Sequence, residues 1–532
     1  MKSLAWAWAA VGVVVVGSSL AQAQSAPSPQ QIVRIRLGAD MVQPTSGRLL
    51  VFAQPWAEAA GQGADVKAVD NNEMSPKAVF VAARELDHLA PGATADIDTD
   101  ETAFPAGFSH LAPGDYAVQA VLDPMHSYAY AGRTAGDVIS NVVKVRLPVA
   151  DVTLTLNHLV PAAAPWELPP SAAQALRDAV PAARQAAQPI DFTSPVLSAF
   201  WGRPIHMRGW VLTPPGYAAH PNERYPTVYW THGFGGNLDR ISGAVVAVNA
   251  GMAAGEMAPM IWVFLDQSSP TGTHEFADGV NNGPWGQALT TELIPDLERR
   301  YRMDARPTGR FLTGHSSGGW ATLWLQIRYP KLFGATWSTS PDSSDFHDFT
   351  GPDIYAPRAN VYRKADGTPW PLVRDKGKVI ATFQEFAQLE AVLGAYGGQM
   401  TSFDWVFSPK GQDGRPLPMF DRATGDVDPA VALYWRDHYD IAYRLQTGWR
   451  ALKSDLDGKI HLIVGTADTF YLDGAAHRLK AVLDGLGARS DIRFLPGKTH
   501  MDLYAEGADR LALLQGLRKV WEGARVPAVS EA

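Results

Sequence analysis

The sequence predicts an α/β fold in which a mostly parallel sheet has helices on both faces, carries a large insertion, and follows a small all-β sandwich domain. Three observations predict this. Through residues 31–160, apolar and polar residues alternate with period two, as in strands with one buried face. Through residues 191–525, short apolar runs alternate with helical patterns, which gives a parallel sheet covered on both faces. Between about residues 342 and 456 this alternation stops, which indicates an insertion.

The overall composition is that of a folded protein with more than one domain. The chain has 532 residues, of which 46% are hydrophobic and 19% are charged. Its net charge of -8 argues against a general nucleic-acid binder, which would need a basic face. The absence of cysteine excludes disulfides, thiolate zinc sites and a cysteine nucleophile.

The first 23 residues have the pattern of a secretory signal peptide. Lys2 precedes an apolar stretch over residues 4–16, and the small-residue site Ala21-Gln22-Ala23 follows. A membrane anchor is the alternative, but this stretch is shorter than the roughly 20 residues that span a bilayer. We therefore expect cleavage after Ala23, a periplasmic or secreted protein, and no membrane contact after cleavage.

The β-sandwich domain is predicted over residues 31–160. Its alternating runs lie at residues 33–37, 116–122, 143–147 and 152–156. His88, His110 and His126 in this region do not have the spacing of metal ligands. Residues 161–190 are rich in alanine and proline, and they predict a linker with a short helix at about 171–184.

In the α/β domain, the predicted strands lie at 206–212, 227–231, 260–265, 310–313, 334–338, 459–465 and 491–495. The predicted helices lie at 238–257, 284–301, 317–329, 471–486 and 508–522. The insertion has plausible helices at 379–393 and 429–445 and a high aromatic content. We interpret it as a cap beside the active site, or as aromatic core packing, or as both. Active sites of such sheets lie at the carboxyl ends of the strands.

The segment Gly314-His315-Ser316-Ser317-Gly318 joins a predicted strand to a predicted helix. A Gly-x-Ser-x-Gly sequence in this context is the nucleophile elbow, a sharp turn that holds the serine Oγ exposed. Ser316 is therefore the predicted nucleophile. The alternative is a loop rich in glycine and serine that has no catalytic role.

A serine nucleophile needs a histidine that accepts its proton and a carboxylate that orients the histidine. Asp468 follows the apolar strand 460–464 and is the predicted acid. Asp473 is the second choice, and Asp342 and Asp345, which follow an earlier strand, are weaker candidates.

His500 lies in the loop after the last predicted strand and is the predicted base. His477 lies within a predicted helix and His438 precedes the acid in the chain, so both fit the order serine, acid, histidine less well.

An oxyanion hole needs two backbone N–H groups near the nucleophile. One is predicted at Ser317, and the other at Phe234 or Gly235 in the glycine-rich loop His232-Gly-Phe-Gly-Gly236. On the same face of the sheet, Trp285, Asn282 and His315 are expected to contact the substrate. His274-Glu275 lacks the second histidine that a zinc-protease helix requires, so no metal site is predicted there.

Three segments carry a resemblance to a known family: residues 232–236, residues 281–286 and residues 314–319. They resemble the "putative esterase" branch of the α/β-hydrolases, which includes enterochelin esterases, feruloyl esterases, esterase D and mycolyltransferases. The resemblance implies the α/β-hydrolase fold, a Ser316, Asp468 and His500 triad, and no metal or organic cofactor.

The expected activity is hydrolysis of a carboxylic ester through an acyl-enzyme on Ser316, with a small-molecule or carbohydrate ester as substrate. Acyl transfer or peptide cleavage by the same residues stays open, because the acyl-enzyme step is shared. A binding protein on a hydrolase scaffold is the alternative without catalysis. The sequence leaves the oligomeric state and the role of the β domain open.

Overall fold

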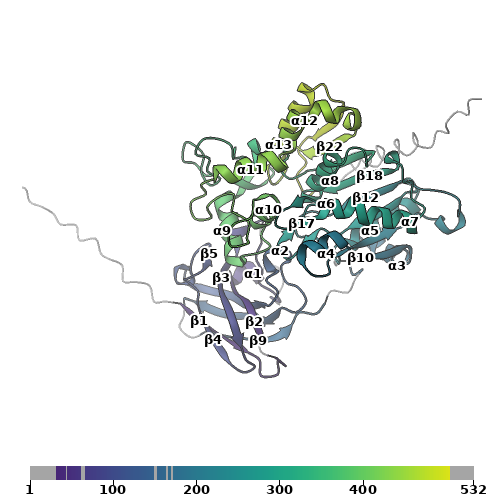
Figure 1. Cartoon of the computed structure of the whole chain (residues 1–532). Helices are drawn as coiled ribbons and strands as arrows, with labels where there is room; N and C mark the ends of the chain where they lie inside the picture. Colours follow the sequence, from purple (N-terminus) through teal and green to yellow (C-terminus); the bar gives the residue numbers. More distant parts are fainter. Residues whose placement is uncertain are drawn as a thin grey trace, which may run out of the picture.

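A computed structural model describes residues 31–43, 45–60, 66–72, 74–148, 152–162, 166–168 and 172–503 (Figure 1). The predicted signal peptide at 1–23 and the predicted C-terminal helix at 508–522 lie outside these residues. Within them, an all-β domain is followed by an α/β domain, as the sequence predicts.

The β domain is built on one curled sheet, in which nine strands can be traced among the described residues. These are β1 (Ile32–Leu37), β2 (Thr45–Pro55), β3 (Phe80–Leu89), β4 (Thr94–Asp98), β5 (Ala103–Phe104), β6 (Gly114–Asp123), β7 (Val138–Ser140), β8 (Val143–Leu147) and β9 (Val152–Leu159). Their order is β4-β1-β9-β7-β6-β2-β3-β5, and β8 pairs with β6. Alternate residues of β1 and β9 share one core with those of β2 and β6, so the sandwich interior is enclosed by a single hydrogen-bonded sheet.

Short helical elements accompany these strands, among them α1 (Trp56–Ala60), α2 (Tyr128–Ala131) and the 3-10 turn η1 (Pro76–Ala78). The outward face of the sheet carries a second cluster that includes Phe52 and Val81. This cluster also contains Leu389 and Val392 from the α/β domain, so the two domains share one core.

The α/β domain has a mixed sheet in the order β10-β11-β13-β12-β18-β19-β22-β23. The bounds are β10 (Ala187–Thr193), β11 (His206–Leu212), β12 (Thr227–Thr231), β13 (Ile261–Leu265), β18 (Arg310–His315), β19 (Ala335–Thr339), β22 (Ile460–Gly465) and β23 (Ser490–Leu495). Strand β11 is antiparallel to both neighbours, and the pairs from β13 to β23 are parallel. The predicted mostly parallel sheet is therefore confirmed, and its parallel strands end at one edge.

Helices cover both faces of this sheet. Alternate residues of one strand point to opposite sides, so Val228 packs with helix α5 (Ser242–Ala253), whereas Tyr229 packs with helix α7 (Ile294–Arg300). The α7 side also carries α4 (Pro195–Trp201), α6 (Trp285–Ala288) and α8 (Ser317–Arg328), and α13 (Leu472–Gly485) follows β22. The predicted helix at 284–301 contains a π-helical turn, η4 (Leu289–Leu293), directly before Pro295, which has no N–H for an α-helical bond.

The region predicted as a linker contributes to this domain. Helix α3 (Gln174–Ala186) packs through Leu176 and Ala183 on the α5 side, and β10 is the edge strand of the sheet. Alanine and proline content alone suggested a linker, but the apolar positions of α3 are buried against α5.

The insertion folds as a cap of short elements. They are η6 (Phe346–Asp348), the hairpin β20 (Pro371–Asp375) with β21 (Lys378–Thr382), α9 (Phe383–Leu393), α10 (Gln399–Phe407), α11 (Pro429–Tyr439) and α12 (Ile441–Leu456). The predicted helix at 379–393 begins later because Thr382 and Glu385 form a capping box. The predicted helix at 429–445 is two helices, since Asp440 ends α11 and accepts the Tyr443 N–H that opens α12.

The remaining short elements lie in loops: η2 (Phe108–His110), η3 (Tyr217–Ala219), η5 (Pro307–Gly309), and the hairpins β14 (Ser268–Ser269) with β15 (Gly272–Thr273) and β16 (Asp278–Gly279) with β17 (Gly283–Pro284). In the part of the chain that the structure describes, no helix has the length and apolar character needed to cross a bilayer.

Candidate active site

Ser316 lies in the turn between β18 and α8, where the elbow was predicted. Its φ of 60° and ψ of -129° are a strained combination for a residue with a side chain. A Cβ on Gly314 would lie 2.3 Å from the carbonyl oxygen of Gly318, so the turn admits only glycine there. The backbone N–H of Ser316 donates to Thr339 O on the neighbouring strand at 3.0 Å, which holds the turn in place.

Asp468 and His500 are brought together from two further strand ends. Asp468 follows β22, His500 follows β23, and Asp468 Oδ2 lies 2.9 Å from His500 Nδ1. Both side chains are almost completely shielded, with 0% and 4% exposure. A buried pair of this kind fixes the proton on Nδ1 and leaves Nε2 as the nitrogen that can accept a proton.

The carboxylate form of Asp468 is favoured. Burial raises its pKa, but the charge of His500 and hydrogen bonds from His500 and the Phe470 N–H outweigh burial, so the pKa lies below its ordinary value. Asp468 is therefore ionised at neutral pH, as an acid that orients a histidine must be.

His315 and Phe470 enclose His500, the predicted base. The ring of His500 lies 4.4 Å from that of His315 and 5.0 Å, edge to face, from that of Phe470. Burial and the nearby His500 lower the pKa of His315 to about 3, so His315 is neutral when His500 accepts a proton. His315 was predicted to contact substrate, and the structure places it directly beside the base.

The weaker candidates have other partners. Asp473 pairs with Arg374 at 2.7 Å, and Asp345 pairs with Arg478 at 3.1 Å. His477 stacks on Phe494, and His438 stacks on Tyr434. These contacts explain why the order of residues along the chain was a better guide than residue type alone.

The predicted oxyanion loop lies against the nucleophile. A Cβ on Gly233 would lie 3.0 Å from Ser316 Cβ, so the loop backbone passes directly beside Ser316. His232 anchors the loop to the end of β13, because its Nε2 lies 3.0 Å from Asp266 Oδ1 and 2.9 Å from Gln267 N. Phe234 and Gly235 follow Gly233 in this loop, and Ser317 directly follows Ser316 and opens helix α8.

Two buried carboxyl groups, those of Asp342 and Glu275, interact electrostatically, and Asp342 lines the pocket with Ser316. Asp342 accepts from Ser317 Oγ at 2.6 Å, and burial raises its pKa to about 6. Glu275 is fully buried, and burial followed by the charge of Asp342 raises its pKa well above the ordinary value. Asp342 was considered only as the triad acid, and the structure places it instead beneath the first turn of α8.

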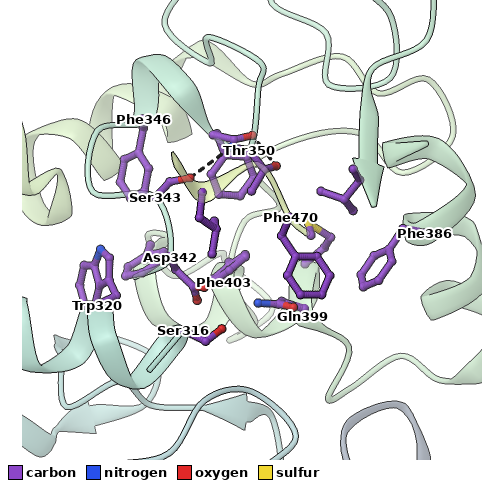
Figure 2. A pocket seen from close by; sticks show the side chains of 15 residues that line it. Ser316, Trp320, Asp342, Ser343, Phe346, Thr350, Phe386, Gln399, Phe403 and Phe470 are labelled. Atoms are coloured by element: carbon purple, nitrogen blue, oxygen red, sulfur yellow. Dashed lines mark hydrogen bonds between the residues drawn. The ribbon is translucent and has the colours of Figure 1, made fainter. Parts of the chain in front are cut away.

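An apolar pocket opens from Ser316 into the insertion (Figure 2). Phe346, Phe386, Phe403 and Phe470 are among its lining residues, and Asp342 lies beside Ser316 at one side. Its cavity volume is about 20 Å³, close to the space that one water molecule needs. An acyl group would therefore enter by moving the lining side chains apart.

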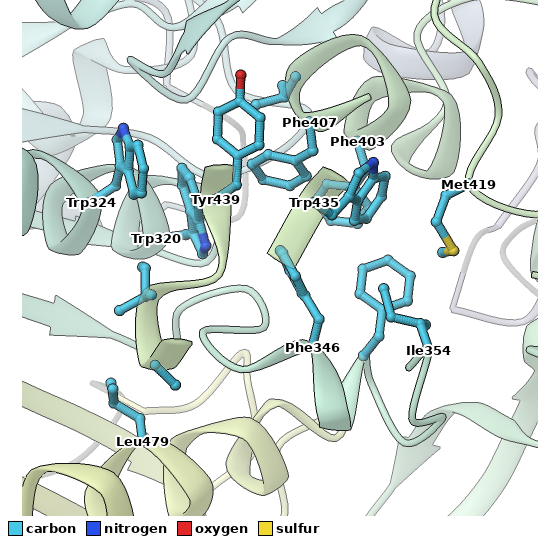
Figure 3. Packing of buried hydrophobic residues seen from close by; sticks show 14 of the residues in the cluster. Trp320, Trp324, Phe346, Ile354, Phe403, Phe407, Met419, Trp435, Tyr439 and Leu479 are labelled. Carbon is cyan, nitrogen blue, oxygen red and sulfur yellow. The ribbon is translucent and has the colours of Figure 1, made fainter. Parts of the chain in front are cut away.

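The same aromatic residues tie the insertion to the nucleophile helix (Figure 3). Trp320 of α8 stacks on Trp324 and contacts Phe407 of α10 at 4.8 Å. Phe346 contacts Phe407 and Trp435 within the same cluster. Both interpretations of the aromatic content are supported, because these rings form a core and also line the pocket.

Comparison with known proteins relates part of the chain to esterases. Residues 201–399 match the family model described as "Putative esterase". The chain is 28% identical to the iron(III) enterobactin esterase of Dickeya dadantii (strain 3937) over 161 residues, which are 29% of this chain and 35% of that protein. The chain therefore spans about a third of the length of this curated relative.

Solved esterase structures resemble this chain more distantly. A ferulic acid esterase matches with 14% identity and a TM-score of 0.38, covering 63% of this chain and 97% of the esterase. An S-formylglutathione hydrolase from Agrobacterium tumefaciens matches with 15% identity and a TM-score of 0.36, covering 63% of this chain and 94% of the hydrolase.

A second hollow lies between the two domains, with a volume of about 780 Å³. Trp285 and Asn282, the other predicted substrate contacts, line this groove and not the pocket of Ser316. Both are largely buried: Trp285 stacks on His274 at 3.7 Å, and Asn282 accepts from Thr271 Oγ1 at 3.1 Å. Their contact with substrate stays a prediction.

One group of side chains has the spacing of metal ligands among the described residues. Asp345, His347 and Asp440 each bring one ligand atom within 4.8 Å of the others. However, Asp345 pairs with Arg478, and Asp440 accepts from Tyr355 Oη and the Phe346 N–H. These partners already satisfy the carboxylates.

Sequence reasoning did not identify the pocket-lining residues of the insertion or the contacts that the β domain makes with the oxyanion loop. No local pattern marks Gln399, Met400 or Phe403 as neighbours of Ser316, since only the packing of α10 brings them there. Asp342 was recognisable in part, because it follows the end of β19.

Proposed function

We propose that this protein is an exported serine esterase that hydrolyses a carboxylic ester through an acyl-enzyme on Ser316. The observation that carries the proposal is the buried Asp468–His500 pair, with 2.9 Å between Oδ2 and Nδ1, set at strand ends near the strand that presents Ser316. A strained serine elbow, an oriented histidine and a glycine-rich loop are what ester cleavage requires.

In the first half of the reaction, Ser316 Oγ attacks the ester carbonyl carbon while His500 Nε2 takes the hydroxyl proton. The carbonyl electron pair moves onto oxygen, and backbone N–H groups of Ser317 and of the Phe234–Gly235 stretch stabilise the negative charge. Collapse of this intermediate breaks the bond to the alcohol oxygen, which takes the proton from His500.

In the second half, water attacks the acyl carbon and gives its proton to His500. The bond to Ser316 Oγ then breaks, the serine recovers its proton, and the carboxylic acid leaves. Asp468 stays ionised throughout, since its role is to stabilise the imidazolium and hold its orientation.

The two hollows suit the two parts of an ester. The pocket beside Ser316 is apolar and narrow, which favours a small or slender acyl group. The interdomain groove is lined by Trp201, Trp405 and Tyr396 and by Arg203 and Arg208, and it offers room for a larger alcohol part. Export rests on residues 1–23 of the sequence alone, and the mass of the mature N-terminus would test cleavage after Ala23.

The test is hydrolysis of p-nitrophenyl acetate, butyrate and octanoate by the mature protein, by Ser316→Ala and by Asp468→Asn. We expect Ser316→Ala to abolish acyl-enzyme turnover and Asp468→Asn to lower kcat by about 10⁴ with little change in KM. Asp473→Asn is the matched control, because it lies near the site but pairs with Arg374, and it should keep most activity.

Labelling by a fluorophosphonate probe gives an independent readout of the nucleophile. Wild type should be labelled at Ser316, and Ser316→Ala should not. Full esterase activity in Ser316→Ala would contradict the proposal. A wild-type protein that is folded but neither labelled nor active on any ester would favour the binding-protein alternative.

A further inference from the structure

The β domain reaches the oxyanion loop through the short helix α2. Tyr130 Oη donates to Gly236 O at 2.6 Å, and the Tyr130 ring packs edge to face against Phe234 at 4.9 Å. These contacts join residues more than a hundred positions apart in the chain. Gly233 of the same loop packs against Ser316, so the loop lies between Ser316 and the β domain.

Arg240 adds a second connection at the same place. Its Nη1 donates to Gly235 O at 2.8 Å, and its Nη2 donates to Ala131 O of helix α2 at 2.7 Å. One guanidinium therefore bridges the loop and the β domain. A planar guanidinium with fixed donors holds two carbonyl groups at a defined separation, which a flexible ammonium would not do as well.

Helix α2 is itself held firmly by the β domain. The Tyr128 N–H donates to Asp123 Oδ2 at 2.7 Å, and the Tyr128 ring stacks on Phe52 of β2 at 5.5 Å. Gly397 of the insertion packs against the other side of Tyr130, where a Cβ would lie 3.1 Å from Tyr130 Cβ. Tyr130 is 9% exposed at this three-way junction.

We infer that Tyr130, assisted by Arg240, is a positioning residue for the oxyanion hole, so that the β domain completes the active site. The inference rests on the proposed function. Oxyanion donors act only when they are held where the charge develops, and small displacements are costly. Tyr130 binds the carbonyl oxygen of Gly236, which directly follows the predicted donor residues Phe234 and Gly235. Arg240 binds the carbonyl oxygen of Gly235, which is itself one of these residues.

The test compares Tyr130→Phe and Arg240→Met with wild type in the full mature protein. Tyr130→Phe keeps the ring contact with Phe234 and removes only the hydroxyl donor. Tyr128→Phe is the matched control, because it removes a phenol hydroxyl from the same helix whose partners, Asp70 and Asn71, lie within the β domain.

The readouts are kcat per titrated active site and KM for p-nitrophenyl butyrate, inhibition by butylboronic acid, and the thermal midpoint. We expect Tyr130→Phe and Arg240→Met to lower kcat roughly tenfold, a fraction of the 10²–10³ lost when an oxyanion donor is removed. KM and the thermal midpoint should change little, and inhibition by the boronate, which forms a tetrahedral adduct on serine, should weaken by a similar factor.

An unchanged kcat in Tyr130→Phe would overturn the inference. An equal loss of kcat in Tyr128→Phe, accompanied by a lower thermal midpoint, would overturn it as well. These results would leave the proposed function intact as long as the fluorophosphonate labels Ser316. Loss of labelling in wild type would instead count against the proposed function itself.

Discussion

At the scale of single residues, the site depends on a few side chains whose surroundings shift their pKa values in opposite directions. The charge and hydrogen bond of His500 lower the pKa of Asp468, whereas burial raises the pKa of Asp342 to about 6, although both are aspartates near Ser316. Opposite shifts of this kind separate a carboxylate that is ionised over a wide pH range from one that takes up a proton in mildly acidic solution.

The raised pKa of Asp342 predicts a pH-dependent stability. The pKa of Asp342 is 3.8, its ordinary value, in the unfolded state and about 6 in the folded state, so folding favours the protonated form. The contribution of Asp342 to the free energy of unfolding is therefore full below pH 3.8 and is lost as the pH rises from 3.8 to 6. The loss is at most about 3 kcal/mol. Asp342→Asn keeps an acceptor for Ser317 Oγ without ionising, so we expect a higher thermal midpoint than wild type at pH 8 and no gain at pH 4.

Thermal unfolding at the two pH values measures this effect. Asp239→Asn is the control, since Asp239 is an exposed aspartate. An equal shift at pH 4 and pH 8 would show that the substitution acts on packing and not on ionisation.

Part of the candidate site could be predicted from the sequence. Ser316, Asp468 and His500 were predicted because each lies at or shortly after the end of an apolar strand and the three occur in the order serine, acid, histidine, and the structure brings Asp468 and His500 together. Asp342 follows a strand as well, and the sequence made it a weaker candidate for the acid than Asp468. Packing separates the two residues further, because Asp468 contacts His500 whereas Asp342 accepts from Ser317 Oγ.

At the scale of elements, the sequence predicted the strands and the presence of the insertion, but not where each helix of the insertion begins and ends. The strand at 227–231 matches β12 because alternate residues face two buried helical layers, a pattern visible in sequence. In the insertion, the sequence predicts one helix at 429–445, but Asp440 caps a second helix there, so the structure has two. Capping residues have short polar side chains, which also occur in loops and turns. Whether such a residue begins a helix therefore depends on the path that packing gives the chain.

Helix α10 sets the size of the acyl pocket, which leads to a prediction about chain length. Met400 is 4% exposed and lines the pocket, so Met400→Ala should make room for two or three more methylene groups of substrate. Each buried methylene is worth about 0.8 kcal/mol. We therefore expect the ratio of kcat/KM for octanoate to that for acetate to rise about tenfold or more.

Met419→Ala is the matched control for this prediction. Met419 is buried in the same aromatic cluster but does not line the pocket. It should lower stability to a similar degree while leaving the preference among p-nitrophenyl esters as in wild type. A rise in the octanoate ratio in both variants would indicate general loosening of the cluster.

At the scale of the whole molecule, the two domains act as one folded unit. Helix α9 supplies Leu389 and Val392 to a core shared with β2 and β3. Arg48 of the β domain donates to Val392 O at 2.6 Å, and Lys77 pairs with Glu385 at 2.7 Å. Sequence identified both domains but not their contact, because the residues involved are far apart in the chain and have no common pattern.

Because the two domains share a core, we expect the protein to unfold in one cooperative transition. A cavity at the domain boundary should separate this transition into two. Leu389→Ala removes a side chain that is 1% exposed at the domain boundary, at a cost of about 2–5 kcal/mol. We expect calorimetry to show one transition for wild type and two for Leu389→Ala, because the β domain then unfolds separately. Its kcat should fall as well, since helix α2 loses its fixed position beside the oxyanion loop.

Leu297→Ala makes a comparable cavity wholly inside the α/β domain, where Leu297 is 0% exposed. It should lower the thermal midpoint while preserving a single transition, because the boundary between the domains is untouched. If both variants unfold in one transition, the α9 cluster does not limit cooperativity. The link between the β domain and the oxyanion loop would then depend on Tyr130 and Arg240 alone, and kcat in Leu389→Ala would stay at the wild-type value.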